Sequence, residues 1–266
     1  PHIALESQDP IKEFDWLAIT IQYEMCYTNI LQVLDLSGIP LLAKDRTEED
    51  PIVIGGGPCT YNPEPIADFF DLFYIGEGET RYEELVNLYR ECRDKKLPRM
   101  EFLRRAAKVP GMYVPAFYEA AYNEDGTLKD FYPIEEGIPS TITKEVEMDV
   151  SHTYYPMKPL VPFMKIAQDR VVLEIMRGCI RGCRFCQAGQ LYRPVRERDV
   201  NLLKEYALTM LKNTGQEEIT LSSLSSSDYR ALPELLTFLL EDLEGKHVNI
   251  SLPSLRIDAF SLDVMS

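Results

Sequence analysis

Three cysteines, Cys179, Cys183 and Cys186, lie in the run RGCIRGCRFCQAGQLYRPVRER and are the residues of this chain best suited to metal chemistry. Three thiolates at this spacing could bind three irons of a four-iron cube and leave the fourth iron open to another ligand. A structural zinc site would call for paired C-x-x-C motifs and a fourth ligand nearby, and neither is evident. A noncatalytic electron carrier would call for a fourth cysteine, for which Cys59 is the candidate in a loop. The spacing therefore favours an iron-sulfur site with an open position.

The remaining cysteines are dispersed, and we interpret Cys26, Cys59 and Cys92 as small buried residues rather than ligands. The sequence shows no apolar signal segment and no run near the ~20 apolar residues that a membrane helix needs. Cysteines scattered in this way are typical of a reducing compartment. We therefore expect a cytoplasmic protein that does not bind membranes.

The chain has 266 residues, 45% of them hydrophobic, and a formal net charge of −15. This length suits one large globular domain or two ordinary ones, and the acidity disfavours capture of nucleic acid by the whole surface. The cysteine segment differs, because Glu197 is its single acid among six arginines: Arg177, Arg181, Arg184, Arg193, Arg196 and Arg198. These arginines could stabilise an anionic cluster, or they could recruit an anionic substrate such as nucleic acid through residues 177–198.

Residues 1–97 alternate between strand and helix patterns. Strand-like runs occupy residues 14–21, 51–57 and 71–78, and amphipathic helical runs occupy residues 27–38 and 79–96. This alternation predicts a parallel sheet with a ligand crevice at the carboxyl ends of its strands.

Glycines stand at two of these strand ends: Gly55, Gly56, Gly57, Gly76 and Gly78. Residues without side chains would let the backbone approach a ligand closely, but they would equally make tight turns. The residues by themselves favour the tight turns, because neither run matches a phosphate-binding or dinucleotide-binding motif.

Residues 98–168 contain prolines that exclude long helices. Two β-rich runs flank the sequence NEDG, which is a hairpin signal. We expect a β-hairpin followed by a proline-rich connector, with the aromatic residues of the hairpin packed against a neighbouring domain.

From residue 169 strand and helix patterns alternate again. Strands are expected within residues 171–176, 217–227 and 247–256, and helices within residues 200–215 and 232–245. The series predicts the start of a TIM-type barrel, with the cysteines directly at the carboxyl end of its first strand. Because the chain begins at Pro1 without methionine and stops after this third strand, we expect a fragment whose first domain is truncated at its start.

The segment CIRGCRFC, with Phe185 before the third cysteine, resembles the cluster motif of the radical S-adenosylmethionine (SAM) superfamily. VIGGGP followed by YIGEGET resembles the cobalamin-binding-like domain that precedes the barrel in one branch of that superfamily. Over nearly its whole length the chain is similar to an uncharacterised bacterial group with this arrangement.

The resemblance implies an α/β fold in three parts. An incomplete Rossmann- or flavodoxin-like parallel sheet would occupy residues 1–97, and a β-rich connector with the hairpin would occupy residues 98–168. The N-terminal part of a partial TIM-type (β/α) radical SAM barrel would occupy residues 169–266.

The resemblance also implies the cofactors. The three cysteines would bind a [4Fe-4S] cluster, and SAM would bind its open iron. The adenine would lie along Phe185, and the SAM carboxylate would pair with Arg256, for which an interdomain salt bridge is the alternative. The SAM amino group would meet three serines, which otherwise form a plain serine-rich loop: Ser222, Ser223 and Ser225.

Cobalamin would lie at the glycine turns, although the chain lacks the Asp-x-His-x-x-Gly loop of many cobalamin domains. The domain would then keep the fold without a histidine ligand or without a cofactor. An external donor such as flavodoxin or ferredoxin would reduce the cluster, and a 5′-deoxyadenosyl radical would modify an RNA or a small molecule. Methylation, methylthiolation and rearrangement are all compatible with the sequence.

Overall fold

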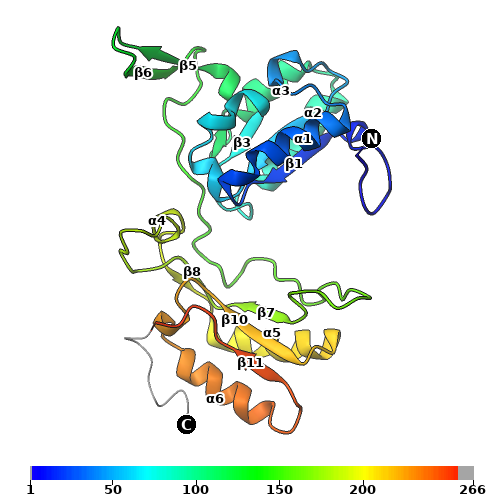
Figure 1. The fold of residues 1–266 in the computed structure, drawn as a ribbon, viewed down its shortest axis with the longest axis vertical. Helices are drawn as coiled ribbons and strands as arrows, with labels where there is room; N and C mark the ends of the chain where they lie inside the picture. The colour runs from blue at the N-terminus through cyan, green and yellow to red at the C-terminus, as the bar shows by residue number, and fades with distance from the viewer. Residues whose placement is uncertain (1, 257–266) are drawn as a thin grey trace. The chain divides into compact units, whose positions relative to one another are not determined.

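A computed structural model describes residues 2–256 of the chain. The chain divides into two compact units, residues 1–147 and residues 148–266, and each unit has its own central sheet (Figure 1). Within the described residues, every helix is too short or too polar to cross a membrane.

The sheet of the first unit has four strands in the order β1-β2-β3-β4. The strands are β1 (Trp16–Thr20), β2 (Ile52–Gly56), β3 (Leu72–Tyr74) and β4 (Met112–Tyr113). The first three run parallel, as the alternation of strand and helix patterns predicts, and β4 is antiparallel to β3. The α-helices of this unit are α1 (Tyr27–Ser37), α2 (Tyr82–Asp94) and α3 (Arg99–Ala106).

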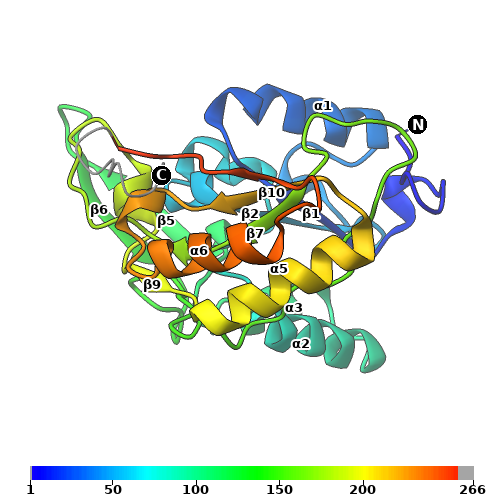
Figure 2. The same cartoon turned by 90° about the horizontal axis from the view of Figure 1, so that it is seen from below.

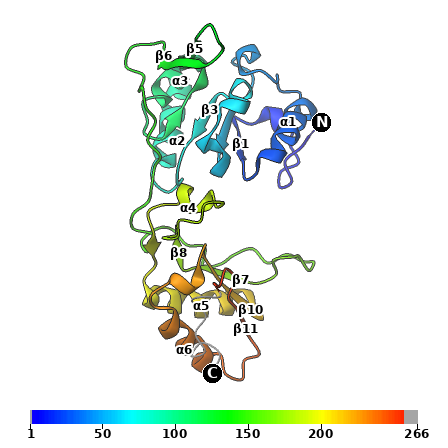
Figure 3. The ribbon, with the colours of Figure 1, turned by 60° about the vertical axis from the view of Figure 1, so that its left-hand side comes forward.

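Helices cover both faces of this sheet (Figure 3). Ile52, Ile54 and Leu72 pack in one core cluster with α2 and α3, whereas Val53 and Phe73 pack in another with α1. Successive residues of a strand point to opposite faces, so a central strand buried on both sides needs a continuous apolar run. This requirement accounts for the sequence PIVIG at β2.

Helix α3 corrects the expectation for the region after residue 97. The prolines there led us to expect a hairpin and an extended connector, yet α3 begins directly after Pro98 and buries Phe102 and Leu103 in the first core. A proline at the start of a helix removes only a donor that would have had no intrahelical partner. Residues 98–147 thereby pack as part of the first unit.

The predicted hairpin is confirmed as β5 (Tyr118–Tyr122) and β6 (Leu128–Pro133), which pair antiparallel across the NEDG turn. We had expected its aromatic residues to pack against a neighbouring domain, but two of them pack within the first unit. The rings of Tyr118 and Phe131 stack with centroids 5.5 Å apart, and Tyr118 also lies 5.0 Å from the ring of Tyr113 in β4. The hairpin is thus joined to the sheet of its own unit.

The second unit has three parallel strands in the order β11-β10-β7. They are β7 (Val171–Glu174), β10 (Glu218–Ser222) and β11 (Asn249–Ser251), and the helices are α5 (Val200–Thr214) and α6 (Leu232–Asp242). Both helices lie on the same side of the sheet (Figure 2) and bury Leu173, Ile219 and Leu221. Strands in chain order with helices outside form the wall of a (β/α) barrel, and this agrees with the predicted fold class.

Three short elements, none of them expected from the sequence, shape the cysteine segment. They are β8 (Met176–Arg177), α4 (Ala188–Leu191) and β9 (Arg196–Glu197). Short 3-10 helices complete the described chain at Ile11–Glu13, Glu24–Cys26, Ala43–Asp45, Pro58–Tyr61, Glu64–Phe69, Pro115–Phe117 and Ser226–Asp228.

Candidate functional site

The cysteine loop, residues 178–195, leaves the second sheet just beyond β7 and is closed at its base by β8 and β9. These strands pair antiparallel, with Met176 opposite Glu197 and Arg177 opposite Arg196. The N–H of Arg198 donates to the carbonyl of Ile175 at 2.9 Å, which ties the exit of the loop to the sheet. The predicted position of the cysteines, at the carboxyl end of the first barrel strand, is thereby confirmed. In barrel enzymes this end of the strands carries the active site.

Gly178 allows the two ends of the cysteine loop to cross closely. Its φ is +81°, and a Cβ built there would lie 2.5 Å from the carbonyl oxygen of Tyr192 and 2.7 Å from that of Pro194. Both contacts are with backbone, which cannot swing away as a side chain could. Glycine is therefore required at this position by conformation and by space.

We expect Gly178→Ala to distort the cysteine loop and to destabilise the second unit by about 1–3 kcal/mol. Gly182→Ala is the matched control, because a Cβ at Gly182 meets nothing within 4 Å in the described structure. The thermal unfolding midpoint and the rate of thiol alkylation should change in the first variant and stay near the unaltered values in the second. Equal behaviour of the two variants would show that the crossing does not constrain the loop.

The three cysteines are free thiols with different exposure. Cys179 is buried at 9% exposure, whereas Cys183 and Cys186 are half-buried. The N–H of Arg181 donates to Sγ of Cys179 at 3.4 Å, and the N–H of Cys186 donates to the carbonyl of Cys183 at 3.0 Å. An N–H group that points at sulfur is typical of the surroundings of iron-sulfur clusters, and thiolates are the ligands that such clusters use. No three histidine, cysteine or acidic side chains within residues 2–256 are arranged to hold a metal ion, and coordination by these cysteines stays a prediction.

Two apolar side chains beside the cysteines face solvent. Phe185 is 92% exposed and Ile180 is 62% exposed. A solvent-exposed aromatic ring next to a candidate metal site offers a surface on which a planar base could stack. The assignment of Phe185 to the adenine of SAM stays a prediction.

Glu174 at the end of β7 pairs with two of the arginines of the cysteine segment. Its carboxylate accepts from Nε of Arg177 at 2.8 Å and from Nη2 of Arg198 at 3.0 Å. The Arg198 side chain is 1% exposed, donates to the carbonyl of Val150, and lies 4.9 Å from the centroid of the Tyr155 ring. Arg198 therefore has a structural role inside the second unit.

The remaining arginines of the cysteine segment differ in their exposure to solvent. Arg196 is also buried and donates to the carbonyls of Tyr192 and Pro194, whereas Arg184 and Arg193 are exposed. Several arginines of the positive segment that the sequence suggests thus bind groups within the second unit. Recruitment of nucleic acid by residues 177–198 stays a prediction, and Arg184 and Arg193 are the arginines best exposed for it.

The serine-rich exit of β10 forms a hydrogen-bonded loop. The hydroxyls of Ser223 and Ser226 are 3.0 Å apart, and the hydroxyl of Ser225 donates to Oδ2 of Asp228 at 2.8 Å. The carbonyl of Ser222 accepts from the N–H of Ile175 at 3.0 Å. These contacts give the serines a structural role, and their binding of the SAM amino group stays a prediction.

Asp228 is the residue of this site that the sequence reasoning missed, although an acid directly after a serine-rich strand exit is a signal that could have found it. Nε of Arg181 donates to Oδ2 of Asp228 at 2.9 Å, and Nη2 donates to Oδ1. The hydrogen bond from Arg181 lowers the pKa of Asp228, with help from Ser225 and from the charges of Arg181 and Arg256, while burial acts in the opposite direction.

Arg256 lies beside the same loop, since its N–H donates to Oγ of Ser227 at 3.2 Å. The structure thus gathers Cys179, Arg181, Asp228 and Arg256 near the carboxyl ends of three strands. A cavity of about 280 Å³ adjoins them, lined by Met176, Ile180, Val195, Glu197, Asp228 and Arg230. Whether Arg256 binds the SAM carboxylate stays a prediction.

The glycine turns of the first unit lie at the carboxyl ends of β2 and β3, as predicted. A Cβ at Gly55 would lie 2.5 Å from the Phe73 ring, and Gly76, at φ +128°, lies in a bridge with Glu145. These two glycines serve close packing, and Gly57 similarly adjoins the backbone of Ile21. A Cβ at Gly56 would meet nothing within 4 Å in the described structure, and one at Gly78 would meet only an ordinary contact at 3.8 Å. Cobalamin binding at these turns stays a prediction.

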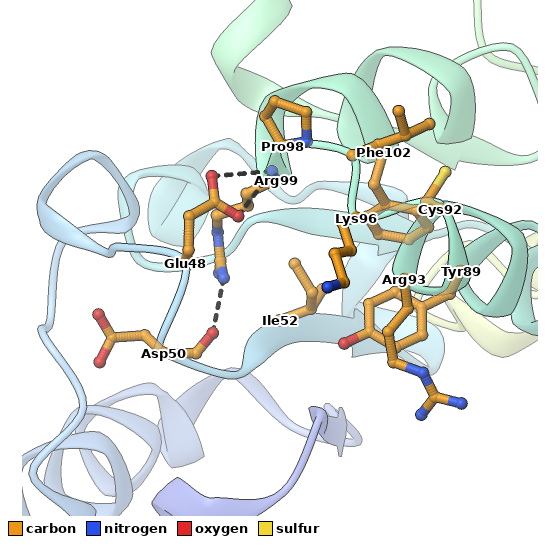
Figure 4. Close-up of a pocket in the computed structure, with 11 residues that line it drawn as sticks. Glu48, Asp50, Ile52, Tyr89, Cys92, Arg93, Lys96, Pro98, Arg99 and Phe102 are labelled. Atoms are coloured by element: carbon orange, nitrogen blue, oxygen red, sulfur yellow. Dashed lines mark hydrogen bonds between the residues drawn. The ribbon is translucent and has the colours of Figure 1, made fainter.

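The opposite, amino edge of the first sheet carries a buried charge network that the sequence did not indicate. Oδ2 of Asp71 accepts from Arg46 at 2.9 Å, from Arg99 at 2.7 Å and from the N–H of Val53 at 2.7 Å. Figure 4 shows the adjoining pocket of about 450 Å³, in which the N–H of Arg99 donates to Glu48. Because most donors of both arginines are occupied, the network holds the edge of the sheet together.

Comparison with known proteins assigns the chain to a family. Residues 1–115 match the family described as radical SAM proteins, N-terminal, and residues 173–265 match the radical SAM superfamily. Residues 173–265 therefore form a radical SAM region, and the region that precedes it matches the N-terminal family of radical SAM proteins. It is 32% identical over 264 residues to an uncharacterized protein of Methanocaldococcus jannaschii, MJ0966, and the match covers 98% of this chain and 49% of that protein. The chain thus spans about half the length of this relative.

Two solved structures are similar to this chain. The cobalamin-dependent SAM radical enzyme OxsB, with aqua-cobalamin and SAM bound, matches 90% of this chain and 30% of its own at 15% identity and a TM-score of 0.51. The radical SAM methyltransferase TsrM of Kitasatospora setae, with cobalamin and a [4Fe-4S] cluster bound, matches 96% of this chain and 47% of its own at 10% identity and a TM-score of 0.49. At such identity the similarity to OxsB establishes a common fold, and this agrees with the α/β class predicted from the sequence.

Proposed function

We propose that this chain forms part of a radical SAM enzyme that binds a [4Fe-4S] cluster and SAM and generates a 5′-deoxyadenosyl radical to modify a substrate. One observation carries the proposal: three free thiols share one loop at the carboxyl end of β7, within the region that matches the superfamily. When bound, the cluster supplies the electron that cleaves SAM reductively. The chain's own residues then have to bind, orient and shield the reactants.

Each part of the cluster and of SAM would have its own residues in the second unit. Cys179, Cys183 and Cys186 would hold the cluster, and the exposed ring of Phe185 would support the adenine. Arg256 would pair its guanidinium with the SAM carboxylate, for which a planar fork is well suited. The amino group would meet hydroxyl or carbonyl oxygens in the loop of Ser222, Ser223 and Ser225.

We further propose that the first unit binds a corrinoid at its glycine turns, in a reaction of the methylation or methylthiolation type. The fold shared with OxsB, a cobalamin-dependent enzyme, supports this proposal, as does the space at Gly56 and Gly78. A corrinoid absorbance spectrum that co-purifies with the full-length protein is the expected result. Its absence after incubation with hydroxocobalamin would leave the first unit without this role.

The enzyme proposal is tested with the full-length protein, reconstituted with iron and sulfide without oxygen. We expect about four irons per chain and, after addition of dithionite and SAM, formation of 5′-deoxyadenosine detected by chromatography. A preparation without dithionite is the control, because reductive cleavage of SAM needs an electron. An intact cluster that yields no 5′-deoxyadenosine under these conditions would refute the proposal.

A further inference from the structure

We propose that Arg181 and Asp228 form a clamp that positions the cysteine loop against the exit of β10. This inference deepens the proposed function, because the loop so positioned is the one proposed to hold the cluster. Arg181 stands between the first two cysteines of the motif, and its peptide N–H donates to Sγ of Cys179 at 3.4 Å. A pairing that holds its side chain in place therefore restrains the backbone that joins Cys179 to Cys183.

The geometry of the contact is that of a bidentate guanidinium-carboxylate pair. Nε of Arg181 reaches one oxygen of Asp228 at 2.9 Å, and Nη2 reaches the other oxygen. The Asp228 side chain is 8% exposed and the Arg181 side chain is 36% exposed, so the carboxylate is shielded from water on most sides. Bidentate pairs of this kind fix direction as well as distance, unlike the point charge of a lysine.

The acceptor side of the clamp is held firmly. Asp228 ends the short 3-10 helix Ser226–Asp228, and its carboxylate also accepts from the hydroxyl of Ser225, a residue that is 2% exposed. The hydroxyl of Ser226 donates to the carbonyl of Pro253 at 2.7 Å, which ties this helix to the chain beyond β11. Through Asp228, Arg181 is thus attached to a loop that is itself hydrogen-bonded to the chain beyond β11.

The other arginines near the cysteines have different partners. Arg177 pairs with Glu174 at the end of β7, and Arg196 donates to carbonyls at the far end of the loop. Nη2 of Arg193 donates to the carbonyl of Arg181 at 3.5 Å, which adds a contact to the same residue. Arg181 therefore ties the cysteine loop to the exit of β10, and we assign it and Asp228 as positioning residues.

The clamp is tested first in metal-free full-length protein, by the rate at which iodoacetamide alkylates Cys179 and Cys183, resolved by mass spectrometry. We expect Asp228→Asn and Arg181→Gln each to raise these rates roughly tenfold, as loss of one charged hydrogen-bonded pair allows. The double variant should be no faster than either single variant, because the two residues act through one contact. Arg230→Gln is the matched control, since Arg230 pairs with Glu197 nearby but is 86% exposed.

A second measurement separates positioning from general stability. Reconstituted Asp228→Asn should still bind iron, and the change that SAM makes in the electron paramagnetic resonance spectrum of the reduced cluster should become weaker and broader. Additive alkylation rates in the double variant, or rates equal to those of Arg230→Gln, would overturn the clamp. Because alkylation needs no metal, failure of the protein to take up iron would count against the proposed function and not against the clamp.

Discussion

Cys183→Ala is expected to remove the iron-sulfur cluster from the reconstituted full-length protein. Cys183 is the middle ligand of the proposed three, and an open cube needs a thiolate at each of its other three irons. The loop itself should keep its fold, because β8 and β9 pair at its base without a contribution from Cys183. Iron per chain and the visible absorbance of the cluster measure the effect, and both should fall to near background.

Cys26→Ala is the control for this experiment. Cys26 is not buried, as we had expected, but is an exposed free thiol in the 3-10 helix Glu24–Cys26 of the first unit, so its loss should leave the iron content unchanged. Full iron content in Cys183→Ala would contradict the assignment. Cys59→Ala would then test the electron-carrier interpretation of the sequence.

Asp71→Ala is expected to destabilise the first unit by about 3–5 kcal/mol, the cost of leaving buried charges without their partner. The side chains of Arg46 and Arg99 are 0% and 8% exposed, and both donate to Asp71. Burial lowers the pKa of Arg46, against the opposing influence of Asp71, so removal of the carboxylate would leave the desolvation cost of that guanidinium without its main opposing charge. The N–H of Val53 in β2 would also lose its acceptor.

Urea unfolding followed by tryptophan fluorescence measures this change within one unit. The chain has one tryptophan, Trp16, and its ring packs 5.1 Å from Tyr89 and 6.1 Å from Phe102 in the first core. Asp94→Ala provides the comparison, because Asp94 pairs with Arg93 at 3.9 Å and its side chain is 76% exposed. The expected loss there is below about 1 kcal/mol. Similar midpoints for both variants would mean that the network contributes nothing to stability.

Features that depend on residues close in the chain were predictable from the sequence. Helix α1 ends before Gly38 at φ 68°, and α5 begins after the cap Asp199 and ends before Gly215 at φ 68°, because capping and left-handed conformations are local preferences. The cysteine spacing, the parallel sheets and the placement of the cysteine loop at a strand end follow from similarly local patterns. The sequence analysis did not predict helix α3, because a proline can begin a helix as well as interrupt one.

Features that join distant residues were decided by the tertiary structure alone. Arg181 and Asp228 are 47 positions apart, and Arg46 and Asp71 are 25 positions apart. Such pairs form because parallel strands bring their ends to one edge of a sheet, and no periodicity in the sequence records which side chains meet there. For the same reason, the sequence alone cannot distinguish the six arginines around the cysteines, which read as one positive segment. Burial and pairing then separate those that build the site, such as Arg198, from those that face solvent, such as Arg184.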